Sequence, residues 1–290
     1  MSGTFIISQG GIGDALLGLA VSYRNGKCRI LHASNSIPTQ GLIARMFRAF
    51  GVPKFDVLPR HFSKEEHCIL RLSPNCVQPT CLPDDLDFED WANFGKYQRR
   101  VITELPVQEL FGKLPKNDRK MVVVAPTGSN FPRTISTPFG ELTKERFISK
   151  EEFVAVVKLL LADCTVYATG SPEDRNRFGI IPDPNFFWMT FDDLVCGDGS
   201  KWDIDIKDLF AIINGSDLVV SADTWVKTYS CMAKVPTIVT RTRYGGQYRD
   251  FQAVRDWGEN IFLRPEIWDL KIIEVEELIS STRLRDMLGL

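Results

Sequence analysis

Short apolar segments alternate with amphipathic helical segments along the chain, and this alternation constrains the fold more than any other feature. In the first part it predicts strands over 5–8, 28–33, 55–58 and 68–72 and helices over 14–23, 37–50 and 88–107. In the second part it predicts strands over 121–125, 164–169, 218–221 and 237–240 and helices over 149–161, 206–213, 224–232 and 273–287. Alternating strands and helices favour an α/β fold with parallel sheets.

The chain has 290 residues, enough for two domains that share one cleft at roughly 100–200 residues per domain. The polar, turn-rich segment 112–120 predicts the linker. We therefore expect a first domain over 1–115 and a second over 116–265. A C-terminal helical segment, 266–290, is expected to pack back on the first domain.

Composition sets limits on the class of protein. The 44% hydrophobic and 25% charged residues match globular proteins, and the apolar stretches fall well short of the roughly 20 residues of a membrane span. The segment Met1–Ile7 lacks the basic and long apolar regions of a secretory signal, so we expect a cytoplasmic protein. Seven cysteines without a CxxC pair predict reduced thiols and no metal site.

Charge is unevenly distributed along the chain. Residues 1–80 contain 9 Lys and Arg against 4 Asp and Glu, and residues 121–290 contain 19 against 25. A basic first domain indicates an anionic partner, although ordinary solvated surface charge accounts for the same numbers.

The loop after the first predicted strand, Ser8–Asp14, is rich in glycine. Gly10, Gly11 and Gly13 let the backbone approach a bound group, which makes them candidates for acceptor binding. A dinucleotide site is not expected, because Leu16 stands where the GxGxxG pattern needs its last glycine. Asp14 begins a helix at the end of a strand and is a candidate general base. Alternatively, it is a helix N-terminal carboxylate stabilised by the macrodipole.

Two later loops carry groups suited to phosphate. After the strand over 121–125, hydroxyls and amides can come from Thr127, Gly128 and Ser129, and positive charge from Arg133, Lys144 or Arg146. After the strand over 218–221, helix amides with Thr224 and Lys227 form a natural pyrophosphate site. Asp223 at that point is otherwise the N-cap of an ordinary helix. Of the two DxD sequences, Asp203–Asp205 is expected to begin a helix, and Asp85–Asp87 to lie in a solvated loop and helix N-terminus, rather than to bind a metal.

Together these loops resemble the two-domain GT-B glycosyltransferases, and most closely the ADP-heptose:lipopolysaccharide heptosyltransferase family, glycosyltransferase family 9. The resemblance depends on three sequences: Gly-Gly-Ile-Gly-Asp14-Ala-Leu-Leu, Ala-Thr-Gly170-Ser171-Pro-Glu173-Asp, and Ser-Ala-Asp223-Thr224 with the later Ala233-Lys-Val-Pro236. It implies two Rossmann-like parallel-sheet domains that face a central cleft, with the C-terminal helix crossing back to the first domain. Trp225 departs from the family pattern, which has glycine there, and Lys227-Thr228 stand where it has Ser-His.

The resemblance also implies a function. The family is inverting and metal-independent, uses a nucleotide diphosphate sugar as co-substrate and needs no other cofactor. Its first domain binds the acceptor and its second the donor. By position, Asp14 is the base. By the same resemblance, Thr127 and Ser129 contact phosphate, and Glu173, which follows Gly170 in the sequence, contacts the nucleoside ribose. Asp223 and Thr224 form the turn that binds the pyrophosphate.

The acceptor stays open between a phosphorylated, lipopolysaccharide-type saccharide and a hydroxymethylated base in DNA, which some phage enzymes glycosylate. Stable membrane insertion is not expected, because no basic amphipathic helix is present. Two other functions remain possible on the same scaffold: a nucleotide-sugar epimerase, and a protein that binds a nucleotide sugar or nucleic acid without catalysis.

Overall fold

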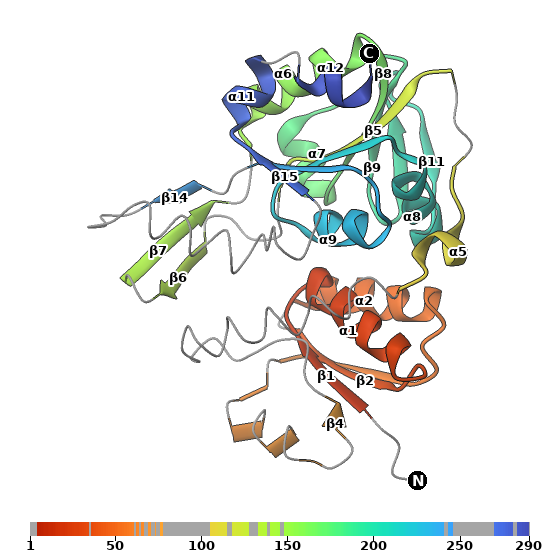
Figure 1. The fold of residues 1–290 in the computed structure, drawn as a ribbon, viewed down its shortest axis with the longest axis vertical. Coiled ribbons are helices and arrows are strands. Elements are labelled where there is room, and N and C mark those ends of the chain that lie inside the picture. Colours follow the sequence, from red (N-terminus) through yellow and green to blue (C-terminus); the bar gives the residue numbers. More distant parts are fainter. Residues whose placement is uncertain are drawn as a thin grey trace. The chain divides into compact units, whose positions relative to one another are not determined.

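In the computed structural model, the chain forms two compact units, Met1–Pro106 and Val107–Leu290. Each is an α/β unit built on a sheet with parallel strands (Figure 1). The structure describes residues 5–34, 36–60, 62–63, 65–66, 69–70, 73, 76–77, 105–114, 118–127, 133–137, 140–145, 148–240, 243–245, 270–280 and 283–289. In these residues, no helix is both long enough and apolar enough to cross a bilayer.

The first unit contains a four-stranded parallel sheet in the order β3-β2-β1-β4. Its elements are β1 (Phe5–Gln9), α1 (Ile12–Arg24), β2 (Arg29–Ala33), α2 (Ile37–Ala49), β3 (Phe55–Leu58) and β4 (Cys76–Val77). The strand predicted over 68–72 is wrong: Ile69 and Leu70 are helical, and Ile69 is 68% exposed rather than buried in a sheet. The helix predicted over 88–107 lies almost entirely outside the described residues.

The second unit contains an eight-stranded sheet in the order β11-β10-β9-β8-β5-β12-β13-β15. The first half of the unit comprises α5 (Val107–Phe111), β5 (Lys120–Ala125), β6 (Arg133–Thr137), β7 (Gly140–Glu145), α6 (Lys150–Leu161), β8 (Cys164–Thr169), α7 (Pro172–Phe178) and β9 (Phe186–Met189). The second half comprises β10 (Asp193–Cys196), β11 (Lys201–Asp203), α8 (Ile206–Gly215), β12 (Leu218–Ser221), α9 (Trp225–Met232), β13 (Thr237–Thr240), β14 (Arg243–Gly245), β15 (Leu270–Ile273), α11 (Val275–Ser280) and α12 (Arg283–Leu288).

The order of the parallel strands identifies the second unit as doubly wound. In chain order the six strands β5, β8, β9, β12, β13 and β15 lie as 3-2-1-4-5-6 across the sheet. The chain therefore moves outward in one direction from β5 and then in the other from β12. In such sheets, ligands bind at the carboxyl ends of the two strands where the direction reverses.

A small antiparallel sheet, β14-β7-β6, was not predicted from the sequence. It places Arg133 opposite Lys144, two of the residues proposed to supply positive charge to a phosphate. Only one apolar pair, Ile135 and Leu142, lies in register between β6 and β7. Strands of five and six residues with so few apolar positions give too weak an alternation to detect.

The C-terminal helices belong to the core of the second unit. Leu278 of α11 and Leu284 of α12 lie in the same buried cluster as Phe153 of α6, and α11 lies beside α6 (Figure 1). The single helix predicted over 273–287 is therefore two short helices, with Val275, Leu278 and Leu288 all buried. The predicted packing of this segment on the first domain stays a prediction.

The chain enters the second unit earlier than the sequence predicted. The amide of Asn214 in α8 donates to the carbonyls of Val107 at 3.1 Å and Gly112 at 2.7 Å. The N–H of Leu114 donates to the carbonyl of Ala211 at 3.0 Å. Residues 107–114 are thus fixed to α8, because buried polar groups are costly to separate from their partners. The start of the predicted linker, 112–114, is therefore part of the second unit.

Candidate functional site

The reversal of strand order in the second unit brings two of the predicted loops together. The N–H of Ala222, after β12, donates to the carbonyl of Ala125 at the end of β5, at 2.8 Å. Thr127 and Asp223 follow directly on these two strands, and both are buried, at 7% and 6% exposure. We call Thr127, Asp223, Thr224 and Lys227 the switch-point cluster. The sequence predicted its members in separate loops, and the topology places them at one edge of the sheet.

Thr224 is the N-cap of α9. Its hydroxyl accepts a hydrogen bond from the N–H of Val226 at 3.0 Å and lies 3.3 Å from Ser221 Oγ. The alternative that made Asp223 the N-cap is therefore wrong. The other N–H groups of the first turn of α9 have no partner within the helix, as at every helix N-terminus, and this end carries the positive part of the helix dipole.

Asp223 instead forms a buried ion pair with Lys227. The ammonium lies 2.7 Å from Asp223 Oδ1, and the two side chains are only 5% (Lys227) and 7% (Asp223) exposed. Removing one partner from such a pair costs about 3–5 kcal/mol, because the other charge stays buried without compensation. An ammonium has three N–H donors, so pairing with Asp223 leaves Lys227 the chemical capacity to contact a phosphate as well.

Gly170 directly follows β8, which pairs with β5, and Glu173 lies in the first turn of α7. Ser171 and Asp174 form a capping box at the start of α7: Ser171 Oγ accepts from the N–H of Asp174 at 3.1 Å, and Asp174 Oδ2 accepts from the N–H of Ser171 at 2.8 Å. A Cβ on Gly170 would lie 2.9 Å from Asp174 Cβ. Residue 170 is therefore glycine for a local packing reason. Glu173 is exposed on the first turn of α7.

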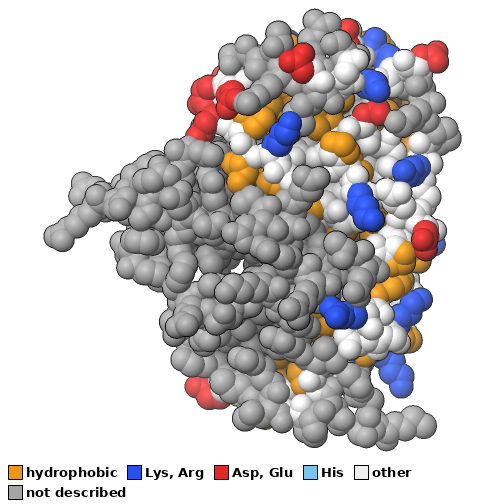
Figure 2. All heavy atoms as spheres, in the orientation of Figure 1, with side chains coloured by type: hydrophobic (Ala, Val, Ile, Leu, Met, Phe, Trp, Pro, Cys, Tyr) orange, Lys and Arg blue, Asp and Glu red, His pale blue; other side chains and the backbone are white. Residues whose placement is uncertain are grey.

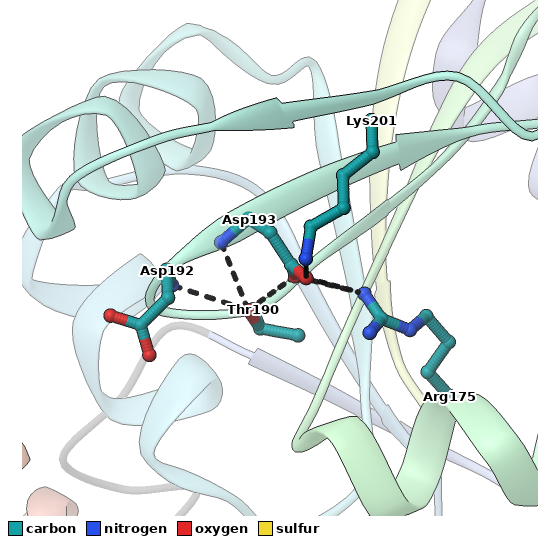
Figure 3. Close-up of polar contacts among 5 residues, drawn as sticks. All are labelled: Arg175, Thr190, Asp192, Asp193 and Lys201. Atoms are coloured by element: carbon teal, nitrogen blue, oxygen red, sulfur yellow. Dashed lines mark hydrogen bonds and ion pairs between the residues drawn. The ribbon is translucent and has the colours of Figure 1, made fainter.

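The turn after β9 is fixed to α7 by a polar network that the sequence did not predict (Figure 3). The Asp193 carboxylate accepts from Thr190 Oγ1 at 2.6 Å and from Arg175 Nη1 at 2.9 Å, and it pairs with Lys201 at 2.9 Å. Burial raises the pKa of Asp193, but hydrogen bonds from Thr190, Lys201 and Arg175 outweigh it and hold the pKa at about 2. These residues are too widely spaced in the sequence to form a recognisable motif.

Trp225, the departure from the family pattern, packs among aromatic side chains. Its ring lies 5.1 Å from that of Phe191 and 6.2 Å from that of Phe210. Phe210 in turn stacks on Tyr229 at 4.3 Å. Trp225 therefore joins the first turn of α9 to α8 and to the turn after β9.

In the first unit, Asp14 lies in the first turn of α1. Its Oδ2 accepts a hydrogen bond from the N–H of Gly11, the N-cap residue of α1, at 3.0 Å. Gly10 has a φ of +120°, and a Cβ there would lie 2.3 Å from Asp14 Oδ2. Only glycine fits this position. Asp14 therefore does serve the helix N-terminus, as the structural alternative predicted, and the same geometry holds its carboxylate against the glycine loop.

His32 and Ser8 contact the backbone of this loop, and neither residue was identified as a site residue from the sequence. The two residues pair in register on β2 and β1. His32 is fully buried, with Nδ1 2.9 Å from Ser8 Oγ and Nε2 3.2 Å from the carbonyl oxygen of Gly10. Ser8 Oγ also lies 3.1 Å from the carbonyl oxygen of Asp14, a second acceptor within reach of its one proton. The sequence signal was a polar residue within each of two apolar strands. That the two residues contact each other follows only from the register of β1 and β2.

The remaining predicted site residues are placed only in part. Gly13 lies in the first turn of α1. Arg133 begins β6, without a described side chain, and Gly128, Ser129 and Arg146 lie outside the described residues. Of the two DxD sequences, Asp85–Asp87 lies outside them too. Asp205 is the N-cap of α8, as predicted, and accepts from the N–H groups of Lys207 and Asp208.

Metal-ligand clusters were sought in the part of the chain that the structure describes. There, no group of three or more His, Cys, Asp or Glu side chains could hold a metal ion. Among the same residues, Cys28, Cys164 and Cys196 are free thiols.

Comparison with known proteins finds a similarity of structure but no match of sequence. No protein-family model matches the chain, and no curated protein does. Among solved structures, the E. coli heptosyltransferase WaaC with ADP matches at a TM-score of 0.52 and 9% identity, over 99% of this chain and 98% of that one. The same enzyme with ADP-2-deoxy-2-fluoro heptose matches at a TM-score of 0.50 and 8% identity, over 99% of each chain. The chain therefore has the fold of these heptosyltransferase structures, and this confirms the α/β fold class predicted from the sequence.

Proposed function

We propose that this protein is a glycosyltransferase that moves a sugar from a nucleotide diphosphate to a hydroxyl group. The observation that carries the proposal is the switch-point cluster, which joins hydroxyls, an ammonium and a helix N-terminus at the ligand-binding edge of a doubly wound sheet. The structures of similar fold were solved with ADP and with an ADP-sugar analogue. A nucleotide diphosphate sugar is thus the donor class that the fold and the cluster favour together.

The cluster suits the chemistry of the leaving group. As the sugar departs, negative charge develops on the β-phosphate, and oriented donors and cations stabilise it. The first-turn amides of α9, Thr224 and Lys227 would supply these groups, with Thr127 from the neighbouring loop. Gly128, Ser129, Arg133 and Arg146 are proposed as further phosphate contacts. Glu173, next to Gly170, is proposed to bind the ribose.

Asp14 is the proposed general base. An acceptor hydroxyl has a pKa far above neutrality, so its attack on the anomeric carbon needs a carboxylate within hydrogen-bond reach. We propose direct displacement with inversion, in which the proton passes to Asp14 and the nucleoside diphosphate leaves. We also propose that transfer needs no metal, since Lys227 and the N-terminus of α9 bring positive charge to the diphosphate. Activity that persists in EDTA supports this, and activity that requires added Mg²⁺ contradicts it.

The acceptor is proposed to be anionic, because residues 1–80 carry an excess of Lys and Arg. On the face drawn in Figure 2, described Lys and Arg side chains are scattered rather than gathered in one patch, while acidic ones gather over α11, where Glu276 and Glu277 are exposed. Gly10, Gly11 and Gly13 are the proposed acceptor contacts. Affinity for DNA that falls steeply with salt indicates the hydroxymethylated-base acceptor; transfer to a phosphorylated saccharide without such affinity for DNA indicates the other.

The experiment that tests transfer uses a panel of nucleotide diphosphate sugars with and without acceptor. We expect free nucleoside diphosphate only when acceptor is present, and loss of that release in Asp14→Asn. The amide oxygen of asparagine can still accept from the N–H of Gly11, so this variant can keep that contact while it removes the negative charge and the basicity. Isomerised donor formed without acceptor indicates an epimerase instead.

One observation favours a second candidate, a protein that binds a nucleotide sugar without transferring it. Asp14 Oδ2 is engaged with the N–H of Gly11 in the helix cap, which is a structural role. This candidate is supported if the parent protein binds donor nucleotide and releases no diphosphate with either acceptor class. It is excluded if Asp14→Asn binds donor normally and loses transfer that the parent performs.

A further inference from the structure

The peptide group between Gly10 and Gly11 has hydrogen-bond partners at both ends. Its carbonyl oxygen lies 3.2 Å from His32 Nε2, and its N–H donates to Asp14 Oδ2 at 3.0 Å. A trans peptide is planar, with C=O and N–H pointing in opposite directions. The orientation of the oxygen toward His32 therefore sets the direction of the N–H toward Asp14.

The ring of His32 is itself held in place. It is fully buried, its Nδ1 lies 2.9 Å from Ser8 Oγ, and the ring of Phe47 packs edge-on at 6.1 Å. A carbonyl oxygen can only accept a hydrogen bond, so Nε2 must carry the proton in the contact with Gly10. In the neutral ring, Nδ1 then accepts the one hydroxyl proton of Ser8, which in that state is not donated to the carbonyl of Asp14. The register of β1 and β2 places this donor beside the ring.

A peptide between two glycines needs such a constraint, because glycine occupies positive and negative φ with similar ease. Gly10 has a φ of +120° here. If the peptide rotated by half a turn, its carbonyl oxygen would face the carboxylate of Asp14 and its N–H would face the N–H of His32. Both contacts would then be repulsive. The protonated Nε2 of His32 and the carboxylate of Asp14 thus favour the same single orientation.

We propose that His32 is a positioning residue for Asp14: by holding the carbonyl of Gly10, it fixes the peptide whose N–H orients the carboxylate. This inference builds on the proposed function, in which Asp14 is the general base. His32 touches neither donor nor acceptor in this account. Its effect on the reaction passes through one rigid peptide plane.

Two substitutions at position 32 test the roles of the two ring nitrogens separately. The side-chain nitrogen of glutamine reaches about as far as Nε2 and can still donate to Gly10, whereas that of asparagine reaches only the position of Nδ1. His32→Gln therefore keeps the contact that matters and His32→Asn removes it. Both are neutral amides in the same buried position, so each serves as the control for the other.

Two readouts follow the proposal, one of them independent of activity. Amide hydrogen exchange at Gly11 is expected to speed up by about tenfold or more in His32→Asn and to stay near the parent rate in His32→Gln. In the transfer assay, His32→Asn is expected to lower kcat by about 10–100-fold, since a displacement of about 1 Å in a reacting group has an effect of this size. The KM for the donor is expected to stay within about twofold in both variants.

Unchanged Gly11 exchange in His32→Asn overturns the inference, and so does an equal loss of kcat in both variants, which indicates a general packing role. Failure of the proposed function looks different: Asp14→Asn then retains full kcat, or the parent shows no transfer. The Gly11 exchange rates still decide whether His32 holds the peptide in that case. A long-range ¹H–¹⁵N spectrum adds a direct check, with Nε2 expected to be protonated and Nδ1 bare.

Discussion

Replacing Lys227 by methionine tests whether the buried pair in the switch-point cluster has both a structural and a binding role. Methionine keeps most of the length of the side chain and removes the charge, which leaves Asp223, at 7% exposure, without the ammonium that lies 2.7 Å away. The expected cost is about 3–5 kcal/mol. For a unit the size of Val107–Leu290, each kcal/mol lowers Tm by roughly 2–4 °C, so Lys227→Met should melt roughly 6–20 °C below the parent.

The double variant Asp223→Asn/Lys227→Met separates stability from binding. It removes both charges, so no isolated charge stays buried, and its Tm is expected to recover most of the loss. Nucleoside diphosphate at about 100 times its dissociation constant should stabilise the parent by about 2.7 kcal/mol. The double variant should lose most of that gain, because it lacks the ammonium. Differential scanning calorimetry with and without the nucleotide measures both effects.

Two results would refute this reasoning. If Lys227→Met melts at the parent temperature, Asp223 and Lys227 do not depend on each other as a buried ion pair. If the double variant gains as much stability from the nucleotide as the parent does, Lys227 does not contact the diphosphate. Lys201→Met, which removes a 56% exposed lysine from Asp193, is the matched control and should leave nucleotide stabilisation unchanged.

Three further predictions concern the supports of the site. Asp193 has a lowered pKa of about 2, so its stabilisation is present above the unfolded pKa of about 3.9 and is lost as pH falls toward 2; the stability difference between parent and Asp193→Asn should shrink over that window in acid unfolding. Gly10→Ala should destabilise by about 1–3 kcal/mol through its φ of +120° and its contact with Asp14, whereas Gly11→Ala, with nothing within 4 Å of the added carbon, should change little; equal denaturation midpoints would contradict this. Asn214→Ala should cost about 1–3 kcal/mol by leaving the carbonyls of Val107 and Gly112 without their donor, and proteolysis of residues 105–114 should speed up; an unchanged cleavage rate would contradict the anchoring of this segment.

The sequence predicted the main elements of the fold because the apolar periodicity of buried strands and helices is local. The strand over 55–58 has its predicted bounds, and β5, β8, β12 and β13 all occupy predicted segments. The strands β9, β10 and β11 and the pair β6–β7 were not predicted, because they are short and their apolar alternation is weak. The packing of the two C-terminal helices in one buried cluster with α6 is tertiary, and no local pattern encodes it.

The sequence predicted which residues belong to the candidate site but not how their side chains contact one another. Asp14, Thr127 and Asp223 were identified because each directly follows, or lies just beyond, a predicted strand. That Thr224 rather than Asp223 caps α9, and that Asp223 pairs with Lys227, depends on side-chain directions that spacing does not determine. His32 needs the register of β1 and β2 as well as the conformation of Gly10. Such contacts arise from tertiary structure, so sequence patterns alone did not reveal them.

The central claim is that a nucleoside diphosphate binds at the switch-point edge of the second unit. The most direct measurement is a crystal structure of the protein with ADP or UDP, whichever gives the larger thermal stabilisation. The account predicts the diphosphate within hydrogen-bond distance of the first-turn amides of α9 and of Lys227, with Thr127 alongside. A diphosphate bound in the first unit, or on the second unit away from the ends of β5 and β12, would contradict it.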